Sequence, residues 1–255
     1  MPAGFNLHSY TSIPIAKSIL PSAPSGSYNY RPGQVIPVIT RWEEGPVITI
    51  EGRMWGLKPT WKKDADLLTQ ARFETAGEKP TFKTAFENSR VAIPMVGYFH
   101  HCKDPKSPAT YEHGLGAGLV LYAGGLSIKS GGIQYVVILT TAIATLDSLF
   151  KETFLIKDSS EHRTPAFLDP ELLQQWLDPE IALPHEFFPV LAPPETMNSL
   201  KVTCKANEGR NDASVLEPPS TYELSHRSET YTRKLARIRD TVHPVSSEEP
   251  DDCPF

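Results

Sequence analysis

The chain has 255 residues, of which 40% are hydrophobic and 22% charged, and its net charge at pH 7 is −5. These values are typical of a globular protein and exclude binding of nucleic acid through bulk positive charge alone. No apolar run approaches the ~20 residues that span a bilayer, and the first residues lack the apolar core of a secretory signal, so we expect neither membrane insertion nor secretion.

The cysteine content indicates the compartment. Three cysteines, Cys102, Cys204 and Cys253, form no even disulfide framework. Thiols persist in reducing compartments, so we expect the protein in the nucleus or the cytoplasm.

The first half of the chain contains strand patterns and one ambiguous segment. Residues 21–33 are rich in Pro, Ser and Gly, which predicts a loop. Residues 34–42 and 45–52 alternate and are β-branched, so both are predicted to be strands. Residues 67–75 fit either a short helix or a loop. Residues 90–101 fit a buried strand that is interrupted at Pro94 and followed by a second extended segment.

The middle of the chain contains the clearest elements. Residues 117–128 and 133–142 are predicted strands, and the Gly131-Gly132 pair between them predicts a hairpin. Residues 144–152 fit a short helix. Residues 168–179 are the clearest helix, with an aspartate before Pro170 as the cap.

These elements indicate an α+β fold, because many short strands occur with few helices. We expect a single domain over residues 1–218. Residues 219–255 are polar and end in an acidic, proline-containing stretch, so we expect a partly disordered tail. The tail is a possible surface for a protein partner, and we expect a monomer. Its basic run at residues 233–239 fits either a nuclear-localisation or DNA-contacting segment or a solvated helix face.

A basic and aromatic stretch covers residues 53–83. Its cations include Lys62 and Lys63, and its rings include Trp55 and Trp61. Such stretches suit single-stranded nucleic acid, because phosphates meet cations and bases stack on rings. The alternative, which stays open here, is a solvated loop with the two tryptophans packed in the core.

Six phrases in a fixed order resemble the SOS-response-associated peptidase (SRAP) family. They are YNYRPGQVIPVI, RMWGLKPTW, QARFETAGEKPTFKTAF, RVAIPMVGYFHH, YVVILTTA and HRTPAFLDPELLQQWL. The resemblance implies one SRAP-like α+β domain with a barrel-like mixed sheet flanked by short helices. It also implies a positively charged groove for single-stranded DNA with abasic sites.

The resemblance also assigns a role to residue 2. In the family this residue is a cysteine, exposed when the initiator methionine is removed, whose amine and thiol trap the aldehyde of an abasic sugar. Here Pro2 takes that position, and Gly4 takes the position of an arginine. None of the three cysteines lies near the N-terminus in sequence, so the thiol is not obviously replaced.

Other candidate catalytic positions are also substituted. Gln70 replaces the asparagine of the family's N-A-R motif, and His100 replaces a glutamate. Glu161 replaces a histidine, although a register shifted by one residue would place His162 there. The family's glutamate and histidine are therefore exchanged as His100 and Glu161.

Two functions follow from the resemblance. The first is a degenerate SRAP-like protein that binds single-stranded or abasic-site DNA in the DNA-damage response, with the covalent cysteine chemistry lost. The second is a repurposed enzyme in which Pro2, His100 and Glu161 act on an abasic-site aldehyde or a small carbonyl substrate. A proline amine can form an iminium with an aldehyde, and a histidine titrates near neutral pH as a base should.

The family motifs also name candidate DNA contacts. These are Asn29, Gln34, Trp55, Gly56, Leu57, Trp61, Arg72, Glu74, Lys83 and Arg163. The run from His100 to Cys102 and His113 offers metal-ligand types, but not in a paired spacing. We therefore expect no metal site and no cofactor.

Overall fold

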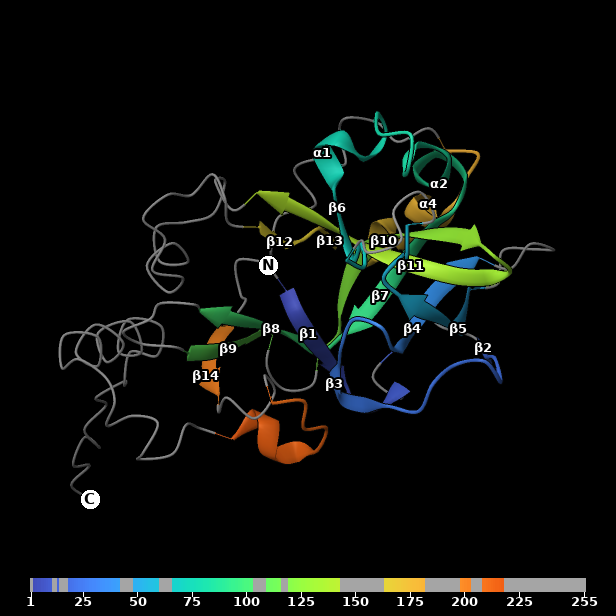
Figure 1. Ribbon diagram of the computed structural model, residues 1–255. Coiled ribbons are helices and arrows are strands. Elements are labelled where there is room, and N and C mark those ends of the chain that lie inside the picture. The colour runs from blue at the N-terminus through green and yellow to red at the C-terminus, as the bar shows by residue number, and fades with distance from the viewer. Residues whose placement is uncertain are drawn as a thin grey trace, which may run out of the picture.

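The computed structural model describes residues 2–10, 13, 18–41, 48–59, 66–102, 109–115, 119–142, 163–181, 198–202 and 208–217 (Figure 1). The helix predicted at 144–152 and the tail predicted at 219–255 lie outside these residues. No helix within them is long and apolar enough to cross a membrane.

Five strands close into a ring-like sheet. They are β4 (Val35–Arg41), β5 (Ile48–Trp55), β7 (Arg90–Met95), β10 (Leu121–Ser130) and β11 (Ile133–Ala142). Strand β4 pairs with β5 and β7, β10 pairs with β7 and β11, and β11 closes the ring through a short parallel pairing with β5. The barrel-like sheet is thereby confirmed as a ring.

The ring has two ends, which we name by one residue each. At the Arg163 end, β11 and β7 finish and β10 begins; at the Lys129 end, β11 and β7 begin and β10 finishes. The hairpin between β10 and β11 lies at the Lys129 end. Its two glycines have φ angles of 57° and 80°, which suit a turn that needs two positive φ values. The predicted hairpin is confirmed.

A second sheet lies beside the ring (Figure 1). In spatial order its strands are β14 (Asn198–Val202), β9 (Ala109–Gly114), β8 (Gly97–Cys102), β1 (Pro2–Leu7) and β3 (Ser27–Tyr30). Only Val96 separates β7 from β8, so the chain passes directly from the ring to this sheet, and the Val96 amide donates to the Asn6 carbonyl at 2.8 Å.

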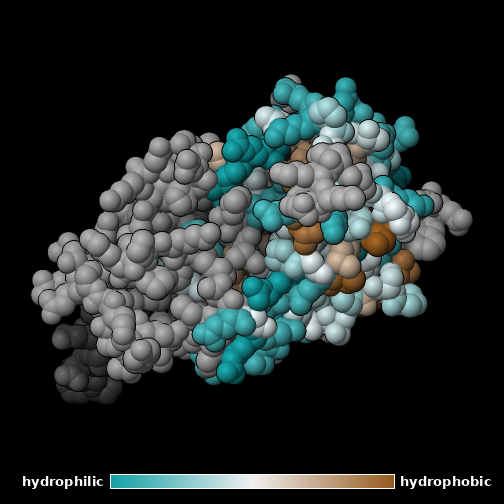
Figure 2. Space-filling view, viewed as in Figure 1, coloured by the Kyte–Doolittle hydropathy of each residue, from teal (hydrophilic) through white to brown (hydrophobic). Residues whose placement is uncertain are grey.

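Short elements complete the described fold. They are β2 (Ser18–Ile19), β6 (Gln70–Arg72), α1 (Phe73–Ala76), α2 (Lys83–Asn88), β12 (Arg163–Pro165), β13 (Phe167–Leu168), η3 (Pro170–Leu172), α4 (Leu173–Leu177) and η7 (Ala213–Leu216). Helix α4 packs on β7 and β4. The surface over α1 and α2 is mostly hydrophilic (Figure 2).

The helix predicted at 168–179 is shorter and begins as a 3-10 turn. The Asp169 carboxylate accepts from the Glu171 amide at 2.8 Å, as the predicted cap requires. Leu173 and Trp176 are fully buried, and the Trp176 indole donates to the Val91 carbonyl at 2.8 Å. Burial of such large side chains stabilises the fold by about 2 kcal/mol each.

Two predictions of local structure need correction. Residues 27–30, inside the predicted loop, form β3, because Phe5 of β1 pairs with Tyr30. Strand β7 continues through Pro94, and the break falls at Val96 instead. The ladder between β4 and β7 is at Ile39 and Ala92 and does not reach Pro94, so a proline is tolerated there.

Candidate functional site

The N-terminal strand lies beside His100. In the antiparallel pairing of β1 with β8, Pro2 is opposite His100, and a register shift separates Pro2 from Gly4. His100 is buried, with 7% of its surface exposed. The structure therefore brings together two of the residues predicted to be catalytic, which are about a hundred positions apart in sequence.

A second histidine lies close to this pair. His113 on β9 is opposite Tyr98, and the ring centroids of His100 and His113 are 6.1 Å apart. His113 is fully buried and packs against the rings of Tyr98 and Tyr111. Burial, followed by the nearby positive charges of His100 and the N-terminus, lowers the pKa of His113 well below its ordinary value.

An ion pair organises the Arg163 end of the ring. The Arg163 guanidinium pairs with the Glu74 carboxylate and donates to Thr140, through Nε to Oγ1 at 3.0 Å and through Nη2 to the carbonyl at 2.6 Å. Glu74 also accepts from the Ala142 amide at 3.1 Å. These contacts join α1, β11 and β12 at one point.

These contacts keep the Glu74 carboxyl ionised. Partial burial raises the pKa of its carboxyl, but its own amide, the Arg163 guanidinium and the Ala142 amide outweigh that effect and lower the pKa overall. Glu74 is therefore a carboxylate at neutral pH. Its role in the structure is to position Arg163.

The histidine cluster and the ion pair are connected. The Tyr98 hydroxyl lies 3.1 Å from Oγ1 of Thr164, the residue after Arg163. Both atoms are buried, and burial raises the pKa of Tyr98, so this phenol stays protonated. This contact links β8, which carries His100, to β12, which carries Arg163.

Gln70 and Arg72 lie on β6, next to the Arg163 end of the ring. In the parallel pairing of β6 with β11, Gln70 is opposite Ile138 and Arg72 is opposite Thr140. Gln70 is half-buried, whereas Arg72 is exposed. The predicted phosphate contact Arg72 is therefore accessible beside the Glu74–Arg163 pair.

Comparisons with known proteins decide the family. The SOS response associated peptidase (SRAP) family matches residues 12–208, which is well over half of the chain. The chain belongs to the SRAP family. The match does not include β1.

Two relatives have names that describe an activity. The Bacillus subtilis abasic site processing protein YoqW is 28% identical over 196 residues, which cover 74% of this chain and 84% of that protein. The Bacillus subtilis abasic site processing protein YoaM is 26% identical over the same length, covering 74% of this chain and 83% of that protein.

Two solved structures share the fold. A protein from Bacteroides thetaiotaomicron superposes with a TM-score of 0.60 at 22% identity, covering 76% of this chain and 85% of that chain. A Bordetella bronchiseptica protein also has a TM-score of 0.60, at 18% identity, covering 79% of this chain and 99% of that chain. At these identities the likeness concerns the fold alone.

Within this SRAP fold, three predicted DNA contacts are core residues. Trp55 is completely buried, packs 5.6 Å from the Phe5 ring and donates from its indole to the Thr69 carbonyl at 3.0 Å. Leu57 is buried as well, and Gly56 has a φ of 106° that suits a glycine. Trp55 cannot stack on a base from this position, because its ring has no exposed face.

Two further candidates hold loops together. Asn29 is buried and donates to the Arg210 carbonyl at 2.8 Å, which ties β3 to the segment before η7. Gln34 is exposed, and its side-chain oxygen accepts from the Arg31 amide at 2.9 Å across a turn. Both side chains therefore form hydrogen bonds within the protein.

Lys83 is exposed at the start of α2 and stays a candidate phosphate contact. The remaining candidates Glu161 and Trp61, with Lys62 and Lys63, lie outside the described residues. No group of three or more His, Cys, Asp or Glu side chains that could hold a metal ion occurs in the described part of the chain.

The atoms around Gly4 leave no space for a Cβ. A Cβ at this position would lie 2.8 Å from the Tyr30 carbonyl oxygen and 2.9 Å from Oδ1 of Asn29. Such distances are too short for any side chain without movement of β3. The glycine that replaces the family's arginine therefore fits a β1 strand packed closely against β3.

Three residues that the sequence analysis did not assign as catalytic or DNA-contacting complete the site. Thr140 contacts Arg163 through two atoms, Tyr98 links β8 to β12, and His113 adds a second buried imidazole. The sequence indicated His113 only as a residue of metal-ligand type, and the pairing of β8 with β9 places it near His100.

Proposed function

We propose that this protein binds single-stranded DNA at abasic sites without forming the stable thiol-and-amine adduct of a cysteine at residue 2. The observation that carries the proposal is the register of β1 and β8. Pro2 lies opposite His100, so the start of the chain is part of a sheet beside an imidazole but offers no thiol. Relatives named as abasic site processing proteins support the choice of ligand.

Exposed or oriented cations support binding through phosphates. Arg72 and Lys83 are exposed, and Arg163 is held by Glu74 and Thr140 in one orientation. Each phosphate contact that is lost should reduce the salt dependence of binding by about one unit of slope. Arg72→Gln and Lys83→Gln therefore give a direct test of which cations face the strand.

The experiment compares abasic and intact single strands of one sequence by fluorescence anisotropy over a salt series. Denaturing gels run in parallel, with Pro2→Cys as the matched variant. We expect tighter, salt-dependent binding of the abasic strand and no denaturation-resistant band from the natural chain. Pro2→Cys should form such a band once Met1 is removed. A resistant band from the natural chain without reductant, or equal affinity for both strands, contradicts the proposal.

The same register favours a second candidate, in which the Pro2 amine forms an iminium with the sugar aldehyde. The amine adds to the aldehyde carbon and water leaves, so the iminium nitrogen would carry the positive charge. His100 could then remove a proton from the carbon next to the iminium carbon, and the 3′-phosphate would leave by β-elimination, which cuts the strand. Borohydride should trap this intermediate with the natural chain, and a form that keeps Met1 should give no trapped band. Trapping that is indifferent to Met1, or no trapping at all, excludes Pro2 as the nucleophile.

A further inference from the structure

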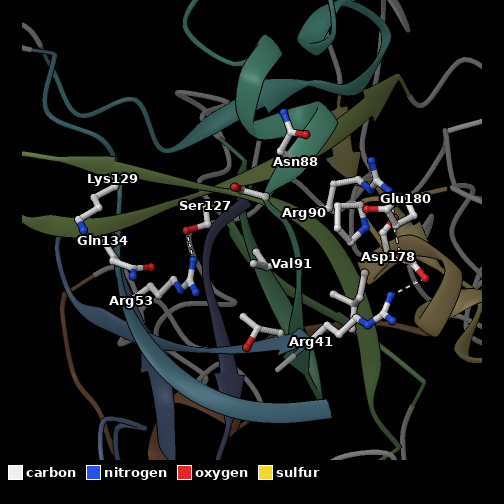
Figure 3. Close-up of a pocket in the computed structure, with 14 residues that line it drawn as sticks. Arg41, Arg53, Asn88, Arg90, Val91, Ser127, Lys129, Gln134, Asp178 and Glu180 are labelled. Carbon is white, nitrogen blue, oxygen red and sulfur yellow. Dashed lines mark hydrogen bonds and ion pairs between the residues drawn. The ribbon is translucent and has the colours of Figure 1, made fainter. Parts of the chain in front are cut away.

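A polar cavity occupies the Lys129 end of the ring, opposite the site described above. Its volume is about 490 Å³, and β4, β5, β7, β10 and β11 all contribute to its lining, together with the end of α4. In Figure 3, Lys129, Gln134 and Arg53 lie on one side of Val91, and Arg41 and Asp178 lie on the other. The cavity thus has two chemically different walls.

The first wall presents hydrogen-bond donors. Lys129 and Gln134 are directly opposite each other on β10 and β11, and both are exposed. Lys129 forms no ion pair with any residue that the structure describes. Arg53 is oriented by an ion pair with Glu51 and by donation to the Ser127 hydroxyl. An uncompensated ammonium therefore stands beside a fixed guanidinium and an amide.

The second wall combines a cation with carboxylates. Arg41 pairs with Asp178, and Glu180 lines the cavity two residues later. The Glu180 amide, and then the Arg41 and Arg90 guanidiniums, lower the pKa of Asp178, so it is ionised at neutral pH. This wall can accept hydrogen bonds from hydroxyl or amino groups of a ligand.

The size of the cavity limits what could fill it. Small-molecule sites have volumes of roughly 300–1,000 Å³, which is much more than an isolated phosphate ion occupies. Arginine and lysine together are the usual partners of phosphate groups, whereas carboxylates repel them. A suitable ligand therefore has an anionic end for the Lys129 wall and a polar, uncharged body for the Asp178 wall.

We propose that this cavity binds a phosphate monoester carried on a sugar, as in a nucleoside monophosphate or at the phosphorylated end of a DNA strand. The phosphate lies against Lys129, Arg53 and Gln134. The sugar and base donate to Asp178 and Glu180. This site is separate from the Pro2–His100 region, because it lies at the other end of the ring.

Calorimetry with the full chain tests the proposal, using deoxyadenosine monophosphate, deoxyadenosine and inorganic phosphate as ligands. We expect the nucleotide to bind most tightly, phosphate more weakly, and the nucleoside not to bind at about 1 mM. Lys129→Gln should weaken nucleotide binding about fivefold, and Lys129→Arg should restore it. Lys79→Gln, which removes an exposed lysine from the segment between α1 and α2, is the matched control and should have no effect.

Three outcomes overturn the proposal. They are the absence of nucleotide binding, an equal affinity of Lys129→Gln and Lys79→Gln for the nucleotide, and equal binding of nucleoside and nucleotide. A 5′-phosphorylated trinucleotide distinguishes the sources: tighter binding than the mononucleotide assigns the site to strand ends, and weaker binding assigns it to free nucleotides.

Discussion

The two ends of the strand ring differ in how completely their charged side chains are paired. At the Arg163 end, the guanidinium is matched by Glu74 and by two atoms of Thr140. The next residue, Thr164, contacts Tyr98, which packs against His113. At the Lys129 end, a cavity of about 490 Å³ is open, and Lys129 forms no ion pair with any described residue. The first arrangement positions side chains, whereas the second leaves donors available to a ligand.

Substitution of Arg90 should have the largest effect on stability, because its side chain is buried and hydrogen-bonded at the Lys129 end. Its guanidinium is buried and donates to five carbonyls: Phe86, Glu87, Trp176, Asp178 and Ile181. Arg90→Met should lower the free energy of unfolding by about 3 kcal/mol, because these carbonyls lose their donor.

Urea denaturation measures this loss. The matched control is Arg41→Met, which removes an ion pair whose arginine side chain is 37% exposed and should cost less than about 1 kcal/mol. Equal losses for the two variants would mean that Arg90 is not what holds α4 to the ring.

Gly4→Ala tests the close contact of β1 with β3. The new Cβ would clash with the Tyr30 carbonyl and Asn29, so we expect a loss of about 2 kcal/mol in the free energy of unfolding. Gly131→Ala is a suitable control, since its Cβ meets nothing within 4 Å and only its φ of 57° opposes the change, at about 1 kcal/mol. A smaller loss for Gly4→Ala than for Gly131→Ala would contradict the packing described for β1.

Arg163→Gln separates the functions of the two ends. It should weaken binding of abasic single strands about tenfold, or 1.4 kcal/mol, because Glu74 and Thr140 no longer orient a cation there. Nucleotide binding at the Lys129 end should be unchanged by the same substitution. Anisotropy and calorimetry on one preparation compare the two effects, and a parallel loss at both ends would show that they are not independent.

The smallest expected effect concerns His113, and it is seen only as a change of stability with pH. Its folded pKa lies below the unfolded value near 6.5, so the unfolded chain binds the proton more tightly and stability falls as pH drops below about 6.5. We expect a loss of about 1 kcal/mol between pH 7.5 and pH 5.5 in urea denaturation. His113→Phe should remove this part of the pH dependence; an unchanged slope would assign it to other groups.

Local patterns predicted the strands and the turn at the Lys129 end. The β-branched runs became β4, β5, β10 and β11, and the Gly131-Gly132 pair forms the turn between β10 and β11. These features depend on residues close in sequence, where alternation and backbone freedom decide the structure. The family motifs also led to Arg163 and Glu74, whose pairing the structure shows.

Tertiary structure alone decided what surrounds these residues. The motif that contains Trp55 is compatible with either an exposed or a buried tryptophan. Only the closed ring shows that the Trp55 indole packs near Phe5 and donates to Thr69. The meeting of Pro2 with His100, and of His100 with His113, depends on strand pairings between distant segments, which no local pattern encodes. The Lys129 cavity needs five strands to close, so its walls exist only after the ring has formed.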